Sequence, residues 1–311
     1  MSPSPRLRSP QILWIALLFC VAALISGWAW LALHLQTGTR PAPVVRVLAP
    51  AQGPRSSWLR VAGSGSNVVL FRQVVAACQL AELGPHVPAV RVEEGIGSGG
   101  GMRALGEGVI DVALVSRPLK PDEQRPDRHV QPYARSAVVV ATHPDVRQLS
   151  ITTEDLAKMW MGQTAQWATG TSAHVLLREP GDSSHAVLLA KRPVLVAAEQ
   201  QARRLGQEVM YHDRTMHAAL QAIPGAVGLV DWSAVSAEAL PLHGLALDGV
   251  APTLAHLRDG TYPIVKELSL VYDGTPSADV AWLLRCVASP QARQTVMSAQ
   301  ALPLAITAVQ P

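Results

Sequence analysis

The chain has 311 residues, of which 49% are hydrophobic, 16% are charged and 5% are aromatic, and its formal net charge at neutral pH is +3. This composition belongs to a globular chain with one added apolar segment, so it excludes a fibrous or an intrinsically disordered protein. The arginines are scattered and form no basic stripe, so we expect no nucleic-acid partner.

The first predicted element is an uncharged apolar run over residues 11–34. At about 1.5 Å per helical residue it spans a hydrocarbon core of about 30 Å. Trp14 and Trp28 lie toward its ends, where aromatic rings prefer the interface. The run is longer than a signal-peptide core and lacks a small-residue cleavage site. We therefore expect a short cytoplasmic tail at 1–10, a transmembrane anchor at 11–34 and a Pro/Gly-rich tether at 35–56.

Beyond the tether, short β-branched runs alternate with helical stretches, which is typical of an α/β fold over residues 57–311. The expected strands are Trp58–Ala62, Ala89–Glu93, Val109–Val115, Ala137–Thr142, Ala173–Leu177 and Ala226–Val230. The expected helices are Val69–Leu83, Gly101–Glu107, Thr153–Met161, Ser183–Ala190, Val194–Arg204, Thr215–Ala222 and Ala278–Ser298.

The cysteines are Cys20, inside the apolar run, and Cys78 and Cys286, each in apolar text that looks helical. No two of them share a metal-ligand spacing, so we expect no metal site. The simpler interpretation of Cys78 and Cys286 is two buried thiols that pack as small hydrophobic side chains. In an oxidising compartment they could pair instead, and the sequence leaves both possibilities open.

Three loops rich in glycine and hydroxyl side chains each follow an expected strand and precede an expected helix. They span residues 63–67, 95–101 and 178–185. Helix N-termini expose unpaired N–H groups and carry partial positive charge, and glycine lets a ligand approach closely. Arg178 adds a permanently charged, forked donor to the third loop. The three loops together predict the capture of an anion.

The neighbouring sequence argues against two enzymatic interpretations of these loops. The second loop spells G-x-G-x-x-G, but Asp111 begins the next strand, whereas a ribose-binding acid ends one. Ser183, Ser184 and His185 are adjacent on an expected helix and point different ways, and no nucleophile elbow is present. We therefore expect no cofactor and no enzymatic activity.

Several segments in a fixed order carry a family resemblance. Among them are V-A-G-S-G-S-N (61–67), E-G-I-G-S-G-G-G (94–101), D-V-A-L-V-S-R-P-L-K (111–120), L-R-E-P-G-D-S-S-H (177–185) and I-P-G-A-V-G-L-V-D (223–231). They resemble the phosphate-binding proteins of Pst-type ABC importers, in the type II periplasmic-binding-protein superfamily, over about residues 58–288. The resemblance implies two α/β lobes, with lobe 1 at about 57–136 and 235–311 and lobe 2 at about 137–234. An oxyanion would lie in the cleft between them.

Carried over by position, the resemblance implies a ligand-binding set from all three loops and from the segment after the third strand. Its members are Ser66, Asn67, the Val68 backbone N–H, Ser98, Gly99, Arg117, Arg178, Ser183 and Ser184.

Two positions depart from the family's pattern. The best-known members have an Asp where this chain has Arg117, and other members carry Ser-Arg there. An arginine still favours anions, so we expect changed selectivity more than changed binding. Asp182 stands where the family has a ligand-binding Ser, and a carboxylate in a desolvated anion site repels the ligand. Alternatively, Asp182 caps the helix that begins at Ser183 and points away from the cleft.

The function that the resemblance implies is the binding of inorganic phosphate or a similar oxyanion, for ABC-type uptake or for sensing. The partner would be an ABC permease or another membrane complex. Arginines flank the anchor almost equally, so the family's location decides the orientation: a single-pass protein of the inner membrane with its domain in the periplasm or outside the cell. The alternative is a ligand-free interaction or scaffold domain of a membrane or envelope complex that keeps the binding-protein fold.

Overall fold

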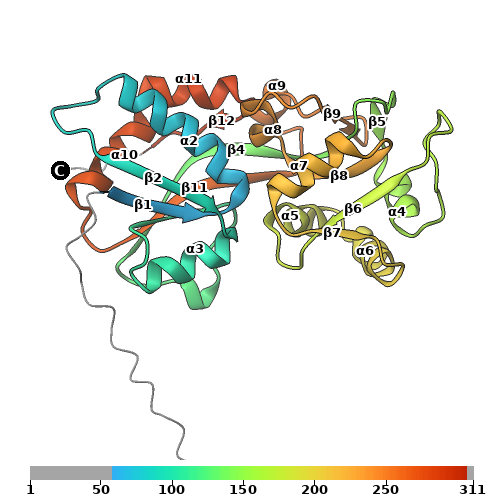
Figure 1. The fold of residues 1–311 in the computed structure, drawn as a ribbon, viewed down its shortest axis with the longest axis horizontal. Coiled ribbons are helices and arrows are strands. Elements are labelled where there is room, and N and C mark those ends of the chain that lie inside the picture. Colours follow the sequence, from blue (N-terminus) through green and yellow to red (C-terminus); the bar gives the residue numbers. More distant parts are fainter. Residues whose placement is uncertain (1–57, 307–311) are drawn as a thin grey trace, which may run out of the picture. The chain divides into compact units, whose positions relative to one another are not determined.

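The computed structural model of the chain describes residues 58–306, which form a mixed α/β domain with two lobes (Figure 1). The strands of lobe 1 are β1 (Trp58–Gly63), β2 (Ala89–Gly95), β3 (Val112–Val115), the first part of β4 (Arg128–Thr142), β11 (Val265–Asp273) and β12 (Leu302–Pro303). Its helices are α2 (Gly65–Leu80), α3 (Gly97–Gly106), the 3-10 turn η1 (Pro121–Glu123), α10 (Ala278–Ala288) and α11 (Pro290–Ser298).

Lobe 2 contains the remaining elements. Its strands are the end of β4, β5 (Ser150–Ile151), β6 (His174–Arg178), β7 (Glu208–Met210), β8 (Ala226–Asp231), β9 (His243–Gly244) and β10 (Ala246–Leu247). Its helices are α4 (Thr153–Trp160), α5 (Ser183–Lys191), α6 (Leu195–Arg204), α7 (Asp213–Ala222), α8 (Trp232–Ala237) and α9 (Leu254–Arg258).

One continuous path of paired strands joins the lobes, in the order β2-β1-β3-β11-β4-β8-β6-β7. The strand β4 makes this possible because it is long: its residues 128–137 pair with β11, and its residues 138–142 pair with β8. In lobe 1, α2, α10 and α11 cover one face of the sheet and α3 covers the other (Figure 1). The pairs β1–β2, β1–β3, β6–β7 and β6–β8 are parallel, so the strand-to-helix loops of each lobe gather at one sheet edge.

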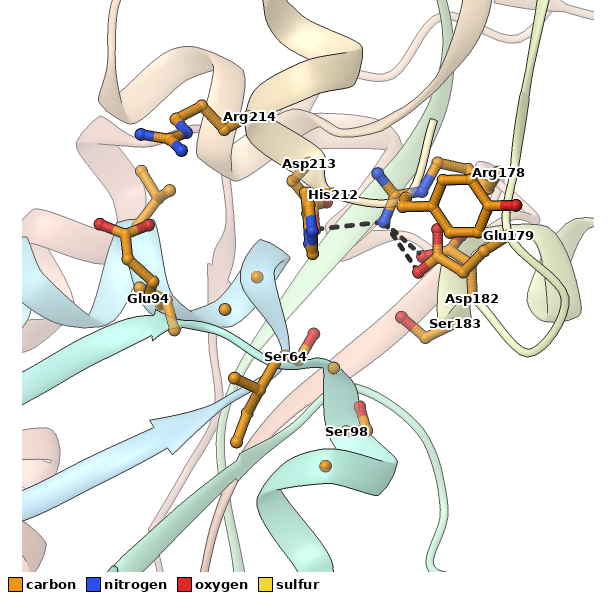
Figure 2. A pocket seen from close by; sticks show the side chains of 18 of the residues that line it. Ser64, Glu94, Ser98, Arg178, Glu179, Asp182, Ser183, His212, Asp213 and Arg214 are labelled. Carbon is orange, nitrogen blue, oxygen red and sulfur yellow. Dashed lines mark hydrogen bonds and ion pairs between the residues drawn. The ribbon is translucent and has the colours of Figure 1, made fainter. Parts of the chain in front are cut away.

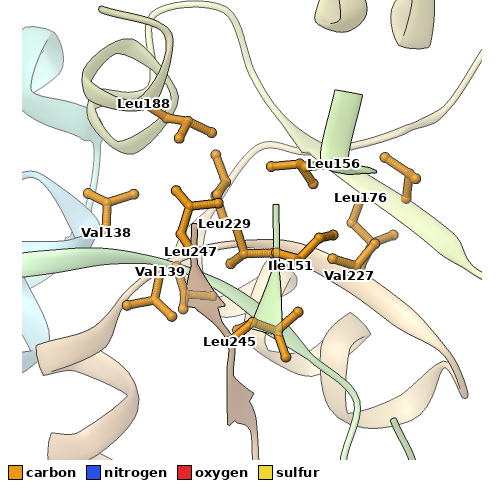
Figure 3. Close-up of a cluster of buried hydrophobic side chains, with 14 of the residues drawn as sticks. Val138, Val139, Ile151, Leu156, Leu176, Leu188, Val227, Leu229, Leu245 and Leu247 are labelled. Atoms are coloured by element: carbon orange, nitrogen blue, oxygen red, sulfur yellow. The ribbon is translucent and has the colours of Figure 1, made fainter. Parts of the chain in front are cut away.

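Each lobe has its own hydrophobic core. The core of lobe 2 begins at Ala137 and ends at Ile264, and that of lobe 1 resumes at Leu268. Ala237 of α8 packs against the lobe 1 core, close to residue 235, where the sequence placed the return to lobe 1. The chain then packs once more in lobe 2, with Leu245 among its strands, before it resumes lobe 1 (Figure 3).

All the expected strands and helices lie within observed elements or overlap them, but one expected helix is divided and several observed elements were not expected. The expected helix over residues 278–298 is two helices, because Ser289 caps the second one and Pro290 occupies its first turn. The strand β11 was not expected, although it lies at the centre of the joined sheet.

Cys78 and Cys286 form a disulfide between α2 and α10, with their Cα atoms 5.6 Å apart. This corrects the simpler interpretation of two separate thiols. Both side chains are fully buried in the lobe 1 core, and the packing of α10 against α2 brings them together. The sequence could not show this approach because 208 residues separate the two cysteines.

Residues 1–57 lie outside the described part of the chain, and with them the expected tail, anchor and tether. Within residues 58–306, no helix has the length and apolar character needed to cross a membrane.

Candidate functional site

A cavity of ≈ 400 Å³ lies where the N-terminal ends of α2, α3, α5 and α7 meet (Figure 2). Ser64 and Ser98 line it from lobe 1, and Arg178 and Ser183 line it from lobe 2. All three predicted loops therefore meet at one place. Four helix N-termini direct partial positive charge here, which favours an anion, and the carboxylates of Asp182 and Asp213 offset part of that charge.

The glycines of the first two loops hold these loops against each other. A Cβ on Gly95 would lie 2.5 Å from the Gly65 Cα, and one on Gly101 would lie 2.8 Å from the Gly63 Cα. The carbonyl of Gly63 also accepts a hydrogen bond from the Ile96 N–H, at 2.8 Å. We expected these glycines to admit a ligand, and the structure shows that several of them instead fit the two loops together.

Arg178 ends β6 and is the central charged group of the site, with only 3% of its surface exposed. Its Nη2 faces three carboxylates: Asp182 at 3.1 Å, Asp213 at 3.3 Å and Glu179 at 3.4 Å. Burial opposes its charge, but these carboxylates outweigh burial and raise the pKa of Arg178 above its ordinary value. Its Nη1 is buried and has no hydrogen-bond partner within residues 58–306.

Asp182 caps a helix, as one of the two alternatives from the sequence expected, but it does not point away from the cleft. Its Oδ1 accepts hydrogen bonds from the backbone N–H groups of Ser184 and His185, so it caps α5. Its Oδ2 accepts from Arg178, so the carboxylate does not point away from the cleft. One residue thus starts the helix and neutralises part of the arginine's charge.

Asp213 begins α7 in lobe 2 and reaches across the cleft to α2 in lobe 1. Its Oδ1 accepts a hydrogen bond from the Ser66 hydroxyl at 3.0 Å, and its Oδ2 lies 2.3 Å from the place where a Cβ on Gly65 would be. Burial alone would raise the pKa of Asp213, but Arg178, Lys266 and the Ser66 hydroxyl together lower it. A carboxylate of the chain itself therefore occupies the position in front of the α2 N-terminus.

Lys266 of β11 is a second buried cation, and the sequence gave no indication of it. Its Nζ donates to the Ser66 and Ser184 hydroxyls at 2.9 and 2.8 Å, and it lies 3.3 Å from Asp231 Oδ2. The two serines belong to different lobes, so the ammonium joins α2 to α5 through their first turns. A third hydroxyl, that of Ser183, lies 3.4 Å from the ammonium.

Asn67 was expected to bind a ligand through its side chain, but that side chain is fully buried in lobe 1. Its Nδ2 donates to the carbonyls of Val115 and Ser269, both at 3.2 Å, and its Oδ1 accepts from the Tyr133 hydroxyl. These bonds direct the amide toward the sheet and hold α2 on β3 and β11. They leave the neighbouring Val68 as a cavity-lining residue.

Arg117 was also expected to bind a ligand, and it too is engaged within the protein. Both of its Nη atoms donate to the Glu123 carboxylate at 2.7 Å, and these hydrogen bonds lower the pKa of Glu123. Such a forked pair uses the geometry that an oxyanion would otherwise take. Arg117 does not line the cavity that contains Arg178.

The expected ligand-binding residues therefore divide into two groups. Those that line the cavity are Val68, Ser98, Gly99, Arg178 and Ser183. Those that do not line it are Ser66, Asn67, Arg117 and Ser184. Sequence reasoning missed Asp213 and Lys266 as members of the site. The position of Asp213, at the start of an expected helix beside other titratable residues, was the only signal available for either of them.

The domain resembles solved binding proteins along most of its length. The model of the PBP superfamily domain matches residues 48–294. A candidate phosphate ABC transporter substrate-binding protein from Clostridium perfringens, solved with bound phosphate, is 17% identical, with a TM-score of 0.66 over 79% of this chain and 99% of that chain. An ABC-type phosphate transport receptor from Vibrio cholerae is 17% identical, with a TM-score of 0.55 over 78% and 99%.

A third solved structure has a similar fold. The reduced form of OxyR from Neisseria meningitidis is 12% identical, with a TM-score of 0.52 over 79% of this chain and 98% of that chain. A comparison with curated proteins finds no match. The structural likenesses therefore establish the fold, and the family model extends over most of the sequence. The chain belongs to the PBP superfamily and has the type II periplasmic-binding-protein fold.

Proposed function

We propose that the chain is a membrane-tethered extracytoplasmic binding protein that holds phosphate or a related oxyanion on Arg178. The binding step is lobe closure around the anion, without chemistry. Residues 11–34 would anchor it in the inner membrane, with the domain in the periplasm or outside the cell, where it would serve an ABC permease or another membrane complex.

The observation that carries this proposal is the buried Nη1 of Arg178, which has no hydrogen-bond partner among residues 58–306. A buried donor without a partner costs free energy, and a charged donor costs more than a neutral one. In a cavity surrounded by helix N-termini, an oxyanion supplies the missing acceptor. The likeness to phosphate-binding proteins supports the same ligand class.

A second candidate is the ligand-free scaffold, and one observation favours it. Arg178 already faces Asp182 and Asp213, and Lys266 already faces Asp231, so each buried cation has an internal counter-charge. The Ser66–Asp213 hydrogen bond also joins the lobes without a ligand. A domain built in this way could stay closed and act through its surface.

Titration calorimetry on the full chain in detergent separates the two candidates. Phosphate, sulfate and arsenate are titrated into the protein and into its Arg178→Met variant. Binding of at least one of these ions that is lost in R178M supports the oxyanion function. Heat from none of them supports the scaffold.

The matched control is Arg128→Met. The side chain of Arg128 is as buried as that of Arg178 and is also paired with a carboxylate, that of Asp273, but it lies in lobe 1 and does not line the cavity. R128M is expected to keep the oxyanion affinity. Equal loss in both variants would mean that R178M acts through folding.

External protease on spheroplasts that express the full chain tests the proposed location, because the periplasmic side of the inner membrane is then accessible. Degradation of the domain in unlysed spheroplasts supports the proposed orientation. Protection of the domain until the spheroplasts are lysed contradicts it.

A further inference from the structure

Two buried atoms of opposite character lack partners in the same cavity. One is the donor Nη1 of Arg178, and the other is the acceptor Oε2 of Glu179; neither has a hydrogen bond within the described residues. Both residues line the cavity, where they follow each other at the end of β6. A fully deprotonated oxyanion satisfies the donor but not the acceptor, because an ionised carboxylate can only accept. A protonated phosphate can donate its O–H to Glu179, but it brings no positive charge to the cavity.

The charges that line the cavity favour the same conclusion. The acidic residues there are Glu94, Glu179, Asp182, Asp213 and Glu238, and the arginines are Arg72, Arg178 and Arg214. Five acids against three arginines leave a charge of −2 when the histidines are neutral. The surplus of acidic residues repels a ligand that carries only negative charge. A ligand that also carries a positive group offsets part of this repulsion.

The size of the cavity allows such a ligand. At ≈ 400 Å³ it is much larger than the share of liquid volume of one water, about 30 Å³, and it falls in the range of sites for organic molecules, about 300–1,000 Å³. A tetrahedral ion would fill a small part of it.

The environment of Glu179 is consistent with a cationic neighbour. Burial raises the pKa of Glu179, and the attraction of Arg178 does not fully offset this effect. A buried carboxylate with a destabilised charge gains from a nearby ammonium group, which stabilises the ionised form.

We propose, on the basis of the oxyanion function above, that the ligand is an oxyanion with its own ammonium group, of the aminoalkylphosphonate or phosphorylated-amine class. The oxyanion accepts from Arg178 Nη1, and the ammonium donates to Glu179 Oε2. This assignment distinguishes the cleft from one built for a bare phosphate ion.

The test compares 2-aminoethylphosphonate with n-propylphosphonate, which carries a methyl group in place of the ammonium group, and with inorganic phosphate. Calorimetry on the full chain should show the amine binding about tenfold tighter or better than either, as expected for a desolvated charge pair. Glu179→Gln should remove this preference, because the ammonium loses its charged acceptor, while propylphosphonate should still bind at least as tightly, because a negative charge beside Arg178 is removed. Glu107→Gln, an exposed residue at the end of α3, should leave the preference intact.

The outcomes separate this inference from the function on which it rests. Phosphate or propylphosphonate binding as tightly as the amine overturns the inference and keeps the oxyanion function. A preference that survives in E179Q also overturns it. No heat with any of the three compounds overturns both proposals. Propylphosphonate binding that is retained or tighter in E179Q shows that the variant is folded, so a lost preference cannot be ascribed to misfolding.

Discussion

The two lobes contribute different chemistry to the same cleft. Lobe 1 contributes the buried hydroxyls of Ser64, Ser66 and Ser98 on tightly packed loops, and the buried Lys266 ammonium, which the Ser66 hydroxyl and Asp231 already engage. Lobe 2 contributes the charged cluster around Arg178, with Asp182 and the partly buried Asp213. Closure therefore brings hydroxyls and an already engaged ammonium onto the Arg178 cluster. We infer that lobe 2 decides which charges the ligand carries, whereas lobe 1 supplies the shape against which the cleft closes.

Removal of the disulfide tests how much this cross-link in the core contributes to the stability of lobe 1. Replacing both Cys78 and Cys286 with serine should lower the free energy of unfolding by about 2–4 kcal/mol, because the unfolded chain gains the freedom that the cross-link removes. Chemical denaturation measures this loss. Oxyanion affinity should be unchanged, because the disulfide joins α2 to α10 inside the lobe 1 core.

The matched control for the disulfide is Cys20→Ser. Cys20 lies outside the described residues and pairs with neither partner, because Cys78 and Cys286 pair with each other. A destabilisation by C20S as large as that of the double variant would contradict the assignment of the effect to lobe 1.

Acid should weaken lobe 2 through Glu199 of α6. The His185 ring beside its carboxylate, at 3.3 Å, and Arg203, at 2.6 Å, outweigh burial and lower the pKa of Glu199 from 4.5 to about 2. A depressed carboxylate pKa stabilises the fold fully above the unfolded value, so this contribution is lost as the pH falls from 4.5 toward 2. Denaturation at a series of pH values measures the loss.

The Glu199→Gln variant removes the contribution of this ionised carboxylate to the free energy of unfolding. It should be less stable than the parent by about 2 kcal/mol at neutral pH, and its stability should fall less steeply below pH 4.5. Glu208→Gln, on the exposed edge of β7, should reproduce the parent's pH profile. If the stability of E199Q falls in acid as steeply as that of the parent, Glu199 is not the source of the acid sensitivity.

The carboxylate of Asp213 should compete with an oxyanion for Arg178. Asp213→Asn removes this negative charge and keeps an oxygen for the Ser66 hydroxyl, so oxyanion affinity should rise about tenfold, or about 1.4 kcal/mol. Calorimetry with phosphate measures the change, and Asp259→Asn, at an exposed turn, serves as the control. A weaker affinity in D213N would show that Asp213 supports binding by holding the lobes together.

Arg117 provides the smallest expected effect. Because Glu123 engages its guanidinium, Arg117→Met should change oxyanion affinity by about twofold at most, within the few tenths of a kcal/mol typical of sites away from the ligand. The same titration measures it. A loss comparable with that of R178M would place a ligand-binding charge in lobe 1 and break the distinction between the lobes.

Local sequence predicted much of the fold and the location of the cleft. Strands and helices followed from periodicity, and the three loops followed from glycines and hydroxyls between them. Arg178 was identified because it lies within one of these loops. The sequence also contains local signals for the break between α10 and α11, namely a cap at Ser289 followed by Pro290. Apolar periodicity continues on both sides of this break, and it favoured the prediction of a single helix.

The sequence by itself thus determined the elements, their order and the loops that meet at the cleft, because these depend on residues close together in the chain. The tertiary structure decided the charges within the cleft. Ser66 meets Asp213 across 147 residues and Lys266 across 200 residues, and no local pattern records such contacts. The physical reason is that a buried charge depends on its spatial neighbours, which folding brings together from distant parts of the chain.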